Sequence, residues 1–209
     1  MFRILQRFSA PDVCNPWRAH DALDCSARAG AERLLRLQQH LDCRPQIVLV
    51  GEAAGYQGCR YSGIPFTSER LLLEGAIPRV ACTGRLTHRP RPWSEPSASI
   101  LWCTLHTLGV AERVVLWNAF PWHPHRSGTP HSNRRPTRTE LACGQPLLRA
   151  LLERFDGARP IAVGQVAHES LVRLLGESVP RLRHPAYGGA VEFARGLAVL
   201  VRGRARRAD

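Results

Sequence analysis

The sequence of 209 residues contains no lysine, so every one of its 29 basic residues is arginine. Without lysine the chain has no side-chain amine for a Schiff base and no lysine for a phosphate-binding P-loop. Acidic residues are also scarce, because 17 aspartates and glutamates leave a formal net charge of +12. Fixed positive charge suits an anionic partner such as a nucleic-acid backbone, which arginine binds through paired hydrogen bonds.

Other signals are missing as well. The seven cysteines form no C-x-x-C pair, so neither a disulfide framework nor a standard zinc or iron–sulfur spacing is visible. No uninterrupted apolar run is long enough to span a membrane, and the first residues lack the apolar core of a signal peptide. We therefore expect one domain over residues 1–209, a cytoplasmic monomer with no metal, no cofactor, no membrane association and no obligatory protein partner.

The most informative stretch is residues 47–69. Four apolar residues, 47–50, predict a buried strand that runs into the small-residue segment Gly51-Glu52-Ala53-Ala54-Gly55. In an open α/β sheet, ligands bind beyond the carboxyl ends of the strands, and small side chains there let backbone N–H groups approach a substrate. Phe66 follows a Gly-Ile-Pro turn, and Ser68 is placed to cap the next helix. The segment therefore resembles part of an active site.

Strand and helix patterns alternate along the rest of the chain. Further strands are predicted at 114–117, 160–163 and 197–201, and helices at 21–41, 69–77, 97–108, 137–154 and 165–175, with residues 1–20 irregular. The alternation favours an α/β fold with a parallel sheet and helices on both faces, a three-layer α/β/α arrangement. The core of this fold is placed at about 45–202, after an N-terminal extension, 1–44, that contains a helix, and before a basic tail, 203–209.

The predicted strand ends collect further polar residues and turns. Asn118 ends the second strand, and Gly164 and Gln165 follow the third. The compact loop 183–189 holds His184. An arginine- and proline-rich surface loop, 78–98, offers Arg79, Arg85, Arg89 and Arg91 to phosphate.

Four of these segments, taken in order, resemble motifs of the uracil-DNA glycosylase superfamily. GEAAG at 51–55 is similar to its first motif, which reads GEAPG in the iron–sulfur-bearing bacterial and archaeal branch. SGIPF at 62–66 resembles the element whose ring stacks on the flipped base, and Asn118 matches the asparagine that reads uracil. RHPAYGG at 183–189 resembles the second motif, whose histidine contacts the base and whose loop enters the duplex.

The resemblance implies a four-stranded parallel sheet between helices and hydrolysis of the N-glycosidic bond of deoxyuridine in DNA. It implies catalytic roles for Glu52 and His184, and base binding by Ala53, Phe66 and Asn118. Contacts to DNA or its phosphates are implied for Gly55, Ser68, Gly164, Gln165, Arg183, Tyr187 and Gly188. The chemistry agrees, because a base must leave the duplex to be reached and an asparagine amide offers both a donor and an acceptor to uracil.

Each key residue also has a purely structural alternative. Phe66 is equally common as a core residue, Asn118 could cap a loop, and a histidine before proline, as His184 is, is usually structural. Glu52 could be a loop carboxylate paired with an arginine.

The sequence departs from the family pattern in its first motif and at the positions of the iron–sulfur cysteines. Ala53 occupies the position where the most studied branch has an aspartate that positions water, which leaves Glu52 to orient or activate the water. Ala54 replaces the proline of the motif, which should loosen the loop. Near the place of the iron–sulfur cysteine pair, Cys25 is followed three residues later by Arg28, so no cluster is predicted.

Three functions follow from these patterns. The first is a monofunctional DNA glycosylase, because a lysine Schiff base is impossible. The second is a DNA-binding member of the same fold that has lost hydrolysis. The third is a metal-dependent hydrolase using His123, His125 and His131 of the long loop 119–136, although no acidic or cysteine residue accompanies them at ligand spacing.

Overall fold

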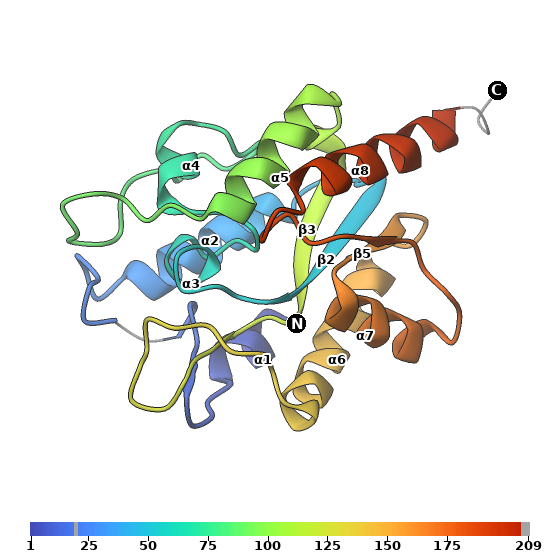
Figure 1. The fold of residues 1–209 in the computed structure, drawn as a ribbon. Coiled ribbons are helices and arrows are strands. Elements are labelled where there is room, and N and C mark those ends of the chain that lie inside the picture. Colours follow the sequence, from blue (N-terminus) through green and yellow to red (C-terminus); the bar gives the residue numbers. More distant parts are fainter. Residues whose placement is uncertain (19–20, 206–209) are drawn as a thin grey trace.

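The computed structural model describes residues 1–18 and 21–205. Its centre is a four-stranded sheet in the order β3-β2-β5-β6, in which all neighbouring strands are parallel (Figure 1). The strands are β2 (Ile47–Ala53), β3 (Val114–Phe120), β5 (Arg159–Val163) and β6 (Arg181–Leu182). A small antiparallel pair, β1 (Val13–Cys14) and β4 (His123–Pro124), ties the N-terminal segment to the chain that follows β3.

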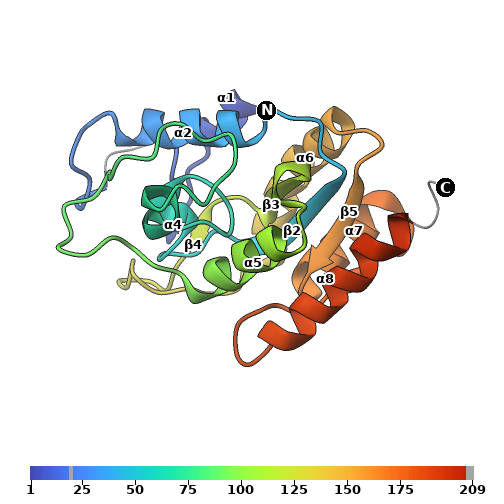
Figure 2. The ribbon, with the colours of Figure 1, turned by 90° about the horizontal axis from the view of Figure 1, so that it is seen from above.

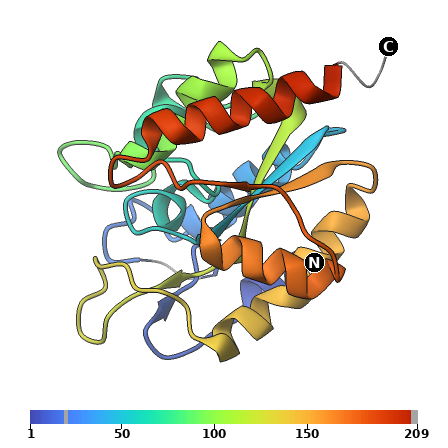
Figure 3. The ribbon, with the colours of Figure 1, turned by 45° about the vertical axis from the view of Figure 1, so that its right-hand side comes forward.

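Helices cover both faces of the sheet. They are α1 (Phe2–Arg7), α2 (Ala29–His40), α3 (Cys59–Ser62), α4 (Glu69–Leu73), α5 (Pro96–Thr107), α6 (Arg138–Arg154), α7 (Gln165–Leu175) and α8 (Ala190–Ala205), with a 3-10 turn at Ala111–Arg113. Figure 3 shows α5 and α8 on one side of the sheet, and α6 and α7 on the other, and Figure 2 gives the same layers from above. The three-layer α/β/α fold predicted from the sequence is therefore confirmed.

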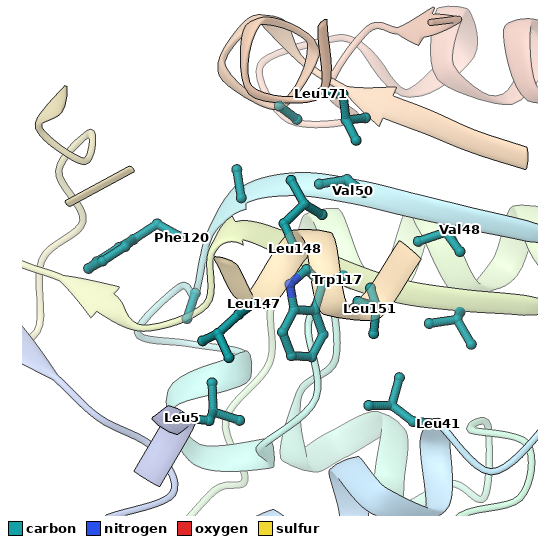
Figure 4. Close-up of a cluster of buried hydrophobic side chains, with 14 of the residues drawn as sticks. Leu5, Leu41, Val48, Val50, Trp117, Phe120, Leu147, Leu148, Leu151 and Leu171 are labelled. Carbon is teal, nitrogen blue, oxygen red and sulfur yellow. The ribbon is translucent and has the colours of Figure 1, made fainter. Parts of the chain in front are cut away.

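The alternation of side chains along β2 and β3 divides the core into two parts. Val48, Val50 and Trp117 point to one face and lie among leucines of α6, as Figure 4 shows. Leu49 and Leu116 point to the opposite face, among residues of α5 and α8. Because both faces are buried, these strands are apolar almost throughout.

Most element boundaries agree with the sequence patterns. The capping box that opens α6 is present: Glu140 N donates to Thr137 Oγ1 (3.2 Å), and Thr137 N donates to Glu140 Oε2 (2.7 Å). No helix within residues 1–18 and 21–205 is long and apolar enough to cross a membrane.

The predicted fourth strand, 197–201, is wrong. These residues belong to α8, and the fourth strand is the short β6 directly before the second motif. Phe193 and Leu197, four residues apart, are fully buried against the sheet, so the apolar pattern has a helical period. Of the predicted tail, 203–205 continue α8, whereas 206–209 lie outside the described residues.

The N-terminal segment also differs from the prediction. Residues 1–20 are not wholly irregular, because Phe2–Arg7 forms α1 and buries Leu5 in the core. The next helix begins at Ala29 rather than at residue 21. Asp24 instead bridges to Thr87, and its carboxylate forms a buried ion pair with Arg33. Local apolar spacing cannot reveal such a long-range attachment.

Candidate active site

The first three residues of the first motif, 51–53, are the last residues of β2, and Ala54 and Gly55 follow the strand. Because β2 and β3 pair in register, Gly51 lies directly opposite Asn118. Asn118 is inside β3, two residues before its end, and its side chain is buried. Parallel pairing thus brings the first motif and the candidate base-reading residue to the same edge of the sheet.

The absence of a side chain at Gly51 allows two groups to meet. A Cβ atom at this position would lie 2.5 Å from Phe66 Cε2 and 2.7 Å from the side-chain amide of Asn118, distances that real structures do not tolerate. The Phe66 ring and the Asn118 amide therefore lie against the bare Cα of Gly51. Phe66 has a φ of 50°, a backbone conformation that is unusual for a residue with a bulky side chain.

His184 joins this group from the second motif. Its ring centroid lies 5.9 Å from that of Phe66, with the two planes tilted by 35°. Gly164, with a φ of 92°, passes beside the Cβ of His184. Phe66, Asn118 and His184, which are far apart in the sequence, are thus brought together at one place.

Hydrogen bonding determines which His184 nitrogen can donate. The backbone N–H of Ala186 donates to Nδ1 (3.1 Å), so this nitrogen acts as an acceptor. Burial lowers the pKa of His184, because a charged imidazolium would lose its hydration. The ring is therefore neutral near pH 7 and carries its proton on Nε2, which is the nitrogen able to donate to a ligand.

The Asn118 amide is held by the backbone on both sides. In the orientation that satisfies both of its ends, Nδ2 donates to the carbonyl of Trp117 (3.2 Å), and Oδ1 accepts from the N–H of Ala54 (3.3 Å). An amide nitrogen has a second hydrogen and an amide oxygen has a second lone pair. The side chain is therefore oriented and still retains one donor and one acceptor.

Glu52, the residue after Gly51 in β2, carries a half-buried carboxylate. Burial raises its pKa, and the positive charge of Arg135 opposes the shift. Among the described residues the carboxylate has no hydrogen bond or ion pair, and Arg135 pairs instead with Glu169 at 3.6 Å. The sequence left open that Glu52 is a loop carboxylate paired with an arginine. The structure shows no such ion pair at Glu52 among the described residues. Ala53 follows at the end of β2, half-buried.

A second carboxylate, Glu95, lies against the loop that follows the first motif. A Cβ at Gly55 would lie 3.0 Å from Glu95 Oε1, and one at Gly58 would lie 2.8 Å from Glu95 Cδ. Burial raises the pKa of Glu95 to about 7. No pattern in the sequence points to Glu95, because nothing local indicates that a residue about forty positions away fills the space above two glycines.

Ser68 does not cap the next helix, contrary to the prediction. It occupies the position before α4, but its side chain makes no capping hydrogen bond. Its Oγ is buried and has no partner among the described residues. The Ser68 side chain is therefore not at the surface.

The second-motif loop projects outward. The Tyr187 side chain is fully exposed, and Tyr187 and Gly188 both have positive φ values, 52° and 78°. Arg183 Nε pairs with Glu192 at 2.9 Å, and its Nη2 donates to the carbonyl of Tyr187 (3.3 Å). On the neighbouring helix α7, Gln165 accepts a hydrogen bond from Arg181 and donates one to Glu169 (2.8 Å).

The three histidines of the 119–136 loop do not form a metal site. Nε2 of His123 donates to the carbonyl of Ser132 (2.8 Å), and burial lowers its pKa to about 3. His131 Nε2 instead bonds with the Tyr61 hydroxyl (3.1 Å). No group of three histidine, cysteine or carboxylate side chains in the described parts of the chain is placed to hold a metal ion. The geometry therefore does not favour the metal-dependent alternative.

Comparisons with known proteins point the same way as the motifs. The family model described as "Uracil DNA glycosylase superfamily" matches residues 38–201. Among solved structures, the crystal structure of wild-type SMUG2 from Pedobacter heparinus is similar to this chain, with a TM-score of 0.64. That similarity covers 98% of this chain and 96% of the other at 15% identity, so it concerns the fold. A search of the curated proteins finds no match.

Proposed function

This chain belongs to the uracil DNA glycosylase superfamily, and we propose that it is a monofunctional DNA glycosylase acting on uracil or another deaminated base. It would hydrolyse the N-glycosidic bond, as the first step of base excision repair. The main support is the meeting of Phe66 and Asn118 at the bare Cα of Gly51, with His184 beside them.

The proposed site holds one extruded base. A base inside a duplex is out of reach, so the enzyme takes it out of the stack and places it on an aromatic face, here that of Phe66. The remaining hydrogen and lone pair of the Asn118 amide match the adjacent acceptor and donor of uracil, O4 and N3–H. Since the Trp117 carbonyl and the Ala54 N–H hold this amide, it needs little reorganisation when the base arrives.

Bond cleavage leaves negative charge on the departing uracil. The proton on Nε2 of His184 is the proposed donor to uracil O2, where part of that charge develops. A neutral imidazole serves this purpose, because the N–H can donate without a protonation step at neutral pH. Ala186 N–H keeps Nδ1 occupied and thereby keeps the proton on the useful nitrogen.

Glu52 is the proposed group that orients or activates the attacking water. Its carboxylate has no partner among the described residues, and burial raises its pKa towards the range in which a general base works best. Ala53 offers no side chain that could take this role. The proposal extends to DNA contacts by the backbone at Gly55 and Gly164 and by the exposed second-motif loop with Tyr187.

The absence of lysine supports the monofunctional part of the proposal. Strand cleavage through a lysine Schiff base is not available, so the product would be an intact abasic site. We further propose that residues 1–209 act as a single domain and a monomer in the cytoplasm, with no metal or cofactor in the reaction.

Release of free uracil tests the proposal directly. Labelled single- and double-stranded oligonucleotides with one uracil are incubated with the protein in the presence of EDTA. We expect free uracil and alkali-labile sites in the DNA. Salt-dependent DNA binding without base release would instead support a binding protein of the same fold. Activity that EDTA abolishes would contradict the metal-independent reaction.

A further inference from the structure

Three flat groups stack on one another near the loop that follows the first motif. The rings of Tyr61 and Trp93 are nearly parallel, with centroids 4.9 Å apart and planes 4° apart. The guanidinium carbon of Arg89 lies 3.7 Å from the centroid of the Trp93 ring. Two groups this close cannot share one face of the indole, so Trp93 lies between them and Arg89 is the outer layer.

Arg60 and Arg79 are held by polar partners, whereas Arg89 is not. Arg60 pairs with Asp21, and Arg79 donates to the carbonyl of Glu112 (2.8 Å). The Arg89 side chain makes no hydrogen bond or ion pair with the described residues. Its guanidinium group stacks on the Trp93 ring instead. It is half-exposed. Its guanidinium is therefore oriented by a ring instead of a carboxylate, and its charge remains available.

The surroundings of this stack attract anions. The segments 75–94 and 113–139 contain no aspartate or glutamate, and they carry nine arginines. Three of these pair with carboxylates outside the segments, Arg79 with Glu112, Arg134 with Glu140 and Arg135 with Glu169, which leaves an excess of positive charge. The loops of both segments project from the same side of the molecule (Figures 1 and 3). The exposed ring of His131 lies 5.8 Å from Trp93. An anionic chain bearing flat bases matches this combination of charge and rings.

The stack is also close to the proposed site for the extruded base. Tyr56 directly follows Gly55, and its ring lies 5.8 Å from that of Trp93. Its backbone N–H donates to Asn133 Oδ1 (3.1 Å), which fixes this loop to the 119–136 loop. From Gly51 to Tyr56 the chain can span at most about 18 Å. Only a few nucleotides therefore separate a base against Phe66 from one at Arg89.

We propose that the outer face of Arg89, supported by Trp93, is a stacking platform for an unpaired base near the extruded base in single-stranded DNA. Nucleobases stack on guanidinium planes as they do on aromatic rings, and this requires a base face that no neighbouring base covers. In a duplex, stacking on the neighbouring base pairs covers those faces. The platform therefore favours single-stranded substrates, and it relies on the proposed function for the identity of the nucleic acid.

The first test measures binding without any base release. Fluorescence anisotropy compares an oligothymidine with an oligonucleotide of equal length whose nucleotides lack bases. The variant Arg89→Lys keeps the charge and removes the plane, and Arg44→Lys is the matched control on an exposed arginine before β2, outside the proposed surface. We expect Arg89→Lys to weaken binding of oligothymidine about fivefold or more, and Arg44→Lys to change it less than twofold.

The oligonucleotide without bases separates stacking from other effects. There Arg89→Lys and the unmodified protein are expected to bind equally, since the platform has no base to hold. If Arg89→Lys and the unmodified protein bound oligothymidine equally well, the proposal would be overturned. A loss of the same size on the base-free oligonucleotide or on duplex DNA would overturn it as well. Thermal unfolding of both variants verifies that the fold is kept.

The second test links the platform to the reaction. On a single-stranded uracil oligonucleotide, Arg89→Lys is expected to raise KM about fivefold and to leave kcat unchanged. An unchanged KM would overturn the placement of the platform along the substrate strand. If the unmodified protein releases no uracil at all, the proposed function fails, whereas a base-dependent loss of oligothymidine binding still supports the platform.

Discussion

At the scale of single residues, the proposed reaction depends most on the groups that face the departing base. Asn118→Ala and His184→Ala each remove a donor directed at developing charge, so we expect kcat/KM for uracil release to fall roughly 100-fold or more. His125→Ala, a change in the 119–136 loop, is the control and should retain full activity. Steady-state kinetics on a uracil oligonucleotide measure the effect, and thermal unfolding verifies folding. Full activity of Asn118→Ala would remove the base-reading role.

Glu52 leads to a prediction in which pH is the variable. Burial raises the pKa of its carboxyl, and a general base works only when ionised, so kcat/KM should rise with pH through that raised pKa and then level off. Glu52→Gln should be much slower and should lose this rise. Because the ionised carboxylate is also the form that burial disfavours, the glutamine variant should unfold at a slightly higher temperature at pH 8. Unchanged rates in Glu52→Gln would exclude the role in water activation.

Which residues the sequence could reveal follows from how they are positioned. Glu52 and Asn118 lie within the last three residues of β2 and β3, and Phe66 and His184 lie in a turn and a loop, so a pattern in the sequence marks them. Phe66, Asn118 and His184 do come together, and their chemical roles remain predictions. Glu95 could not be found in this way, because it approaches the first-motif loop from the start of α5, a contact that only the tertiary structure creates.

At the scale of elements, the packing of β2 against the residues around it depends on a glycine. Gly51→Ala would place a Cβ 2.5 Å from Phe66 Cε2 and 2.7 Å from the Asn118 side-chain amide, so both groups must move. Overpacking of this kind costs about 1–3 kcal/mol of folding stability. We expect a lower unfolding midpoint and a higher KM for uracil release. Gly84→Ala is the control, because a Cβ there meets nothing within 4 Å. Equal stability of the two variants would contradict this packing.

Two misassigned elements, the C-terminal part of α8 and the strand β6, are too short or too uniform in pattern to be recognised. Residues 197–201 are an uninterrupted apolar run, yet they form part of α8. Phe193 and Leu197, one helical turn apart, bury the same face of this helix. Short apolar runs fit a strand or a buried helix equally well. By contrast, β2, β3 and β5 were predictable, since runs buried on both faces of a parallel sheet are apolar throughout. β6 was missed because two residues provide no period at all.

At the scale of the whole molecule, two buried histidines should make folding sensitive to acid. His40 is fully buried, its Nε2 accepts from the backbone N–H of Leu116 (2.9 Å), and burial lowers its pKa to about 3. The pKa of His123 is lowered to about 3 as well. In the unfolded chain a histidine titrates near about 6.5. The unfolded state therefore binds protons that the folded state excludes.

The sign of the pH effect follows from this difference. The contribution of both histidines to stability is fully present above about pH 6.5 and is lost progressively as the pH falls from there towards 3. We expect the urea midpoint to drop clearly between pH 7 and pH 5. His123→Gln should flatten this dependence, whereas His88→Gln, at an exposed position, should leave it unchanged. His123→Gln removes the imidazole that titrates at this position. If the urea midpoint fell equally with pH in the unmodified protein, His123→Gln and His88→Gln, groups other than His123 would govern the acid response.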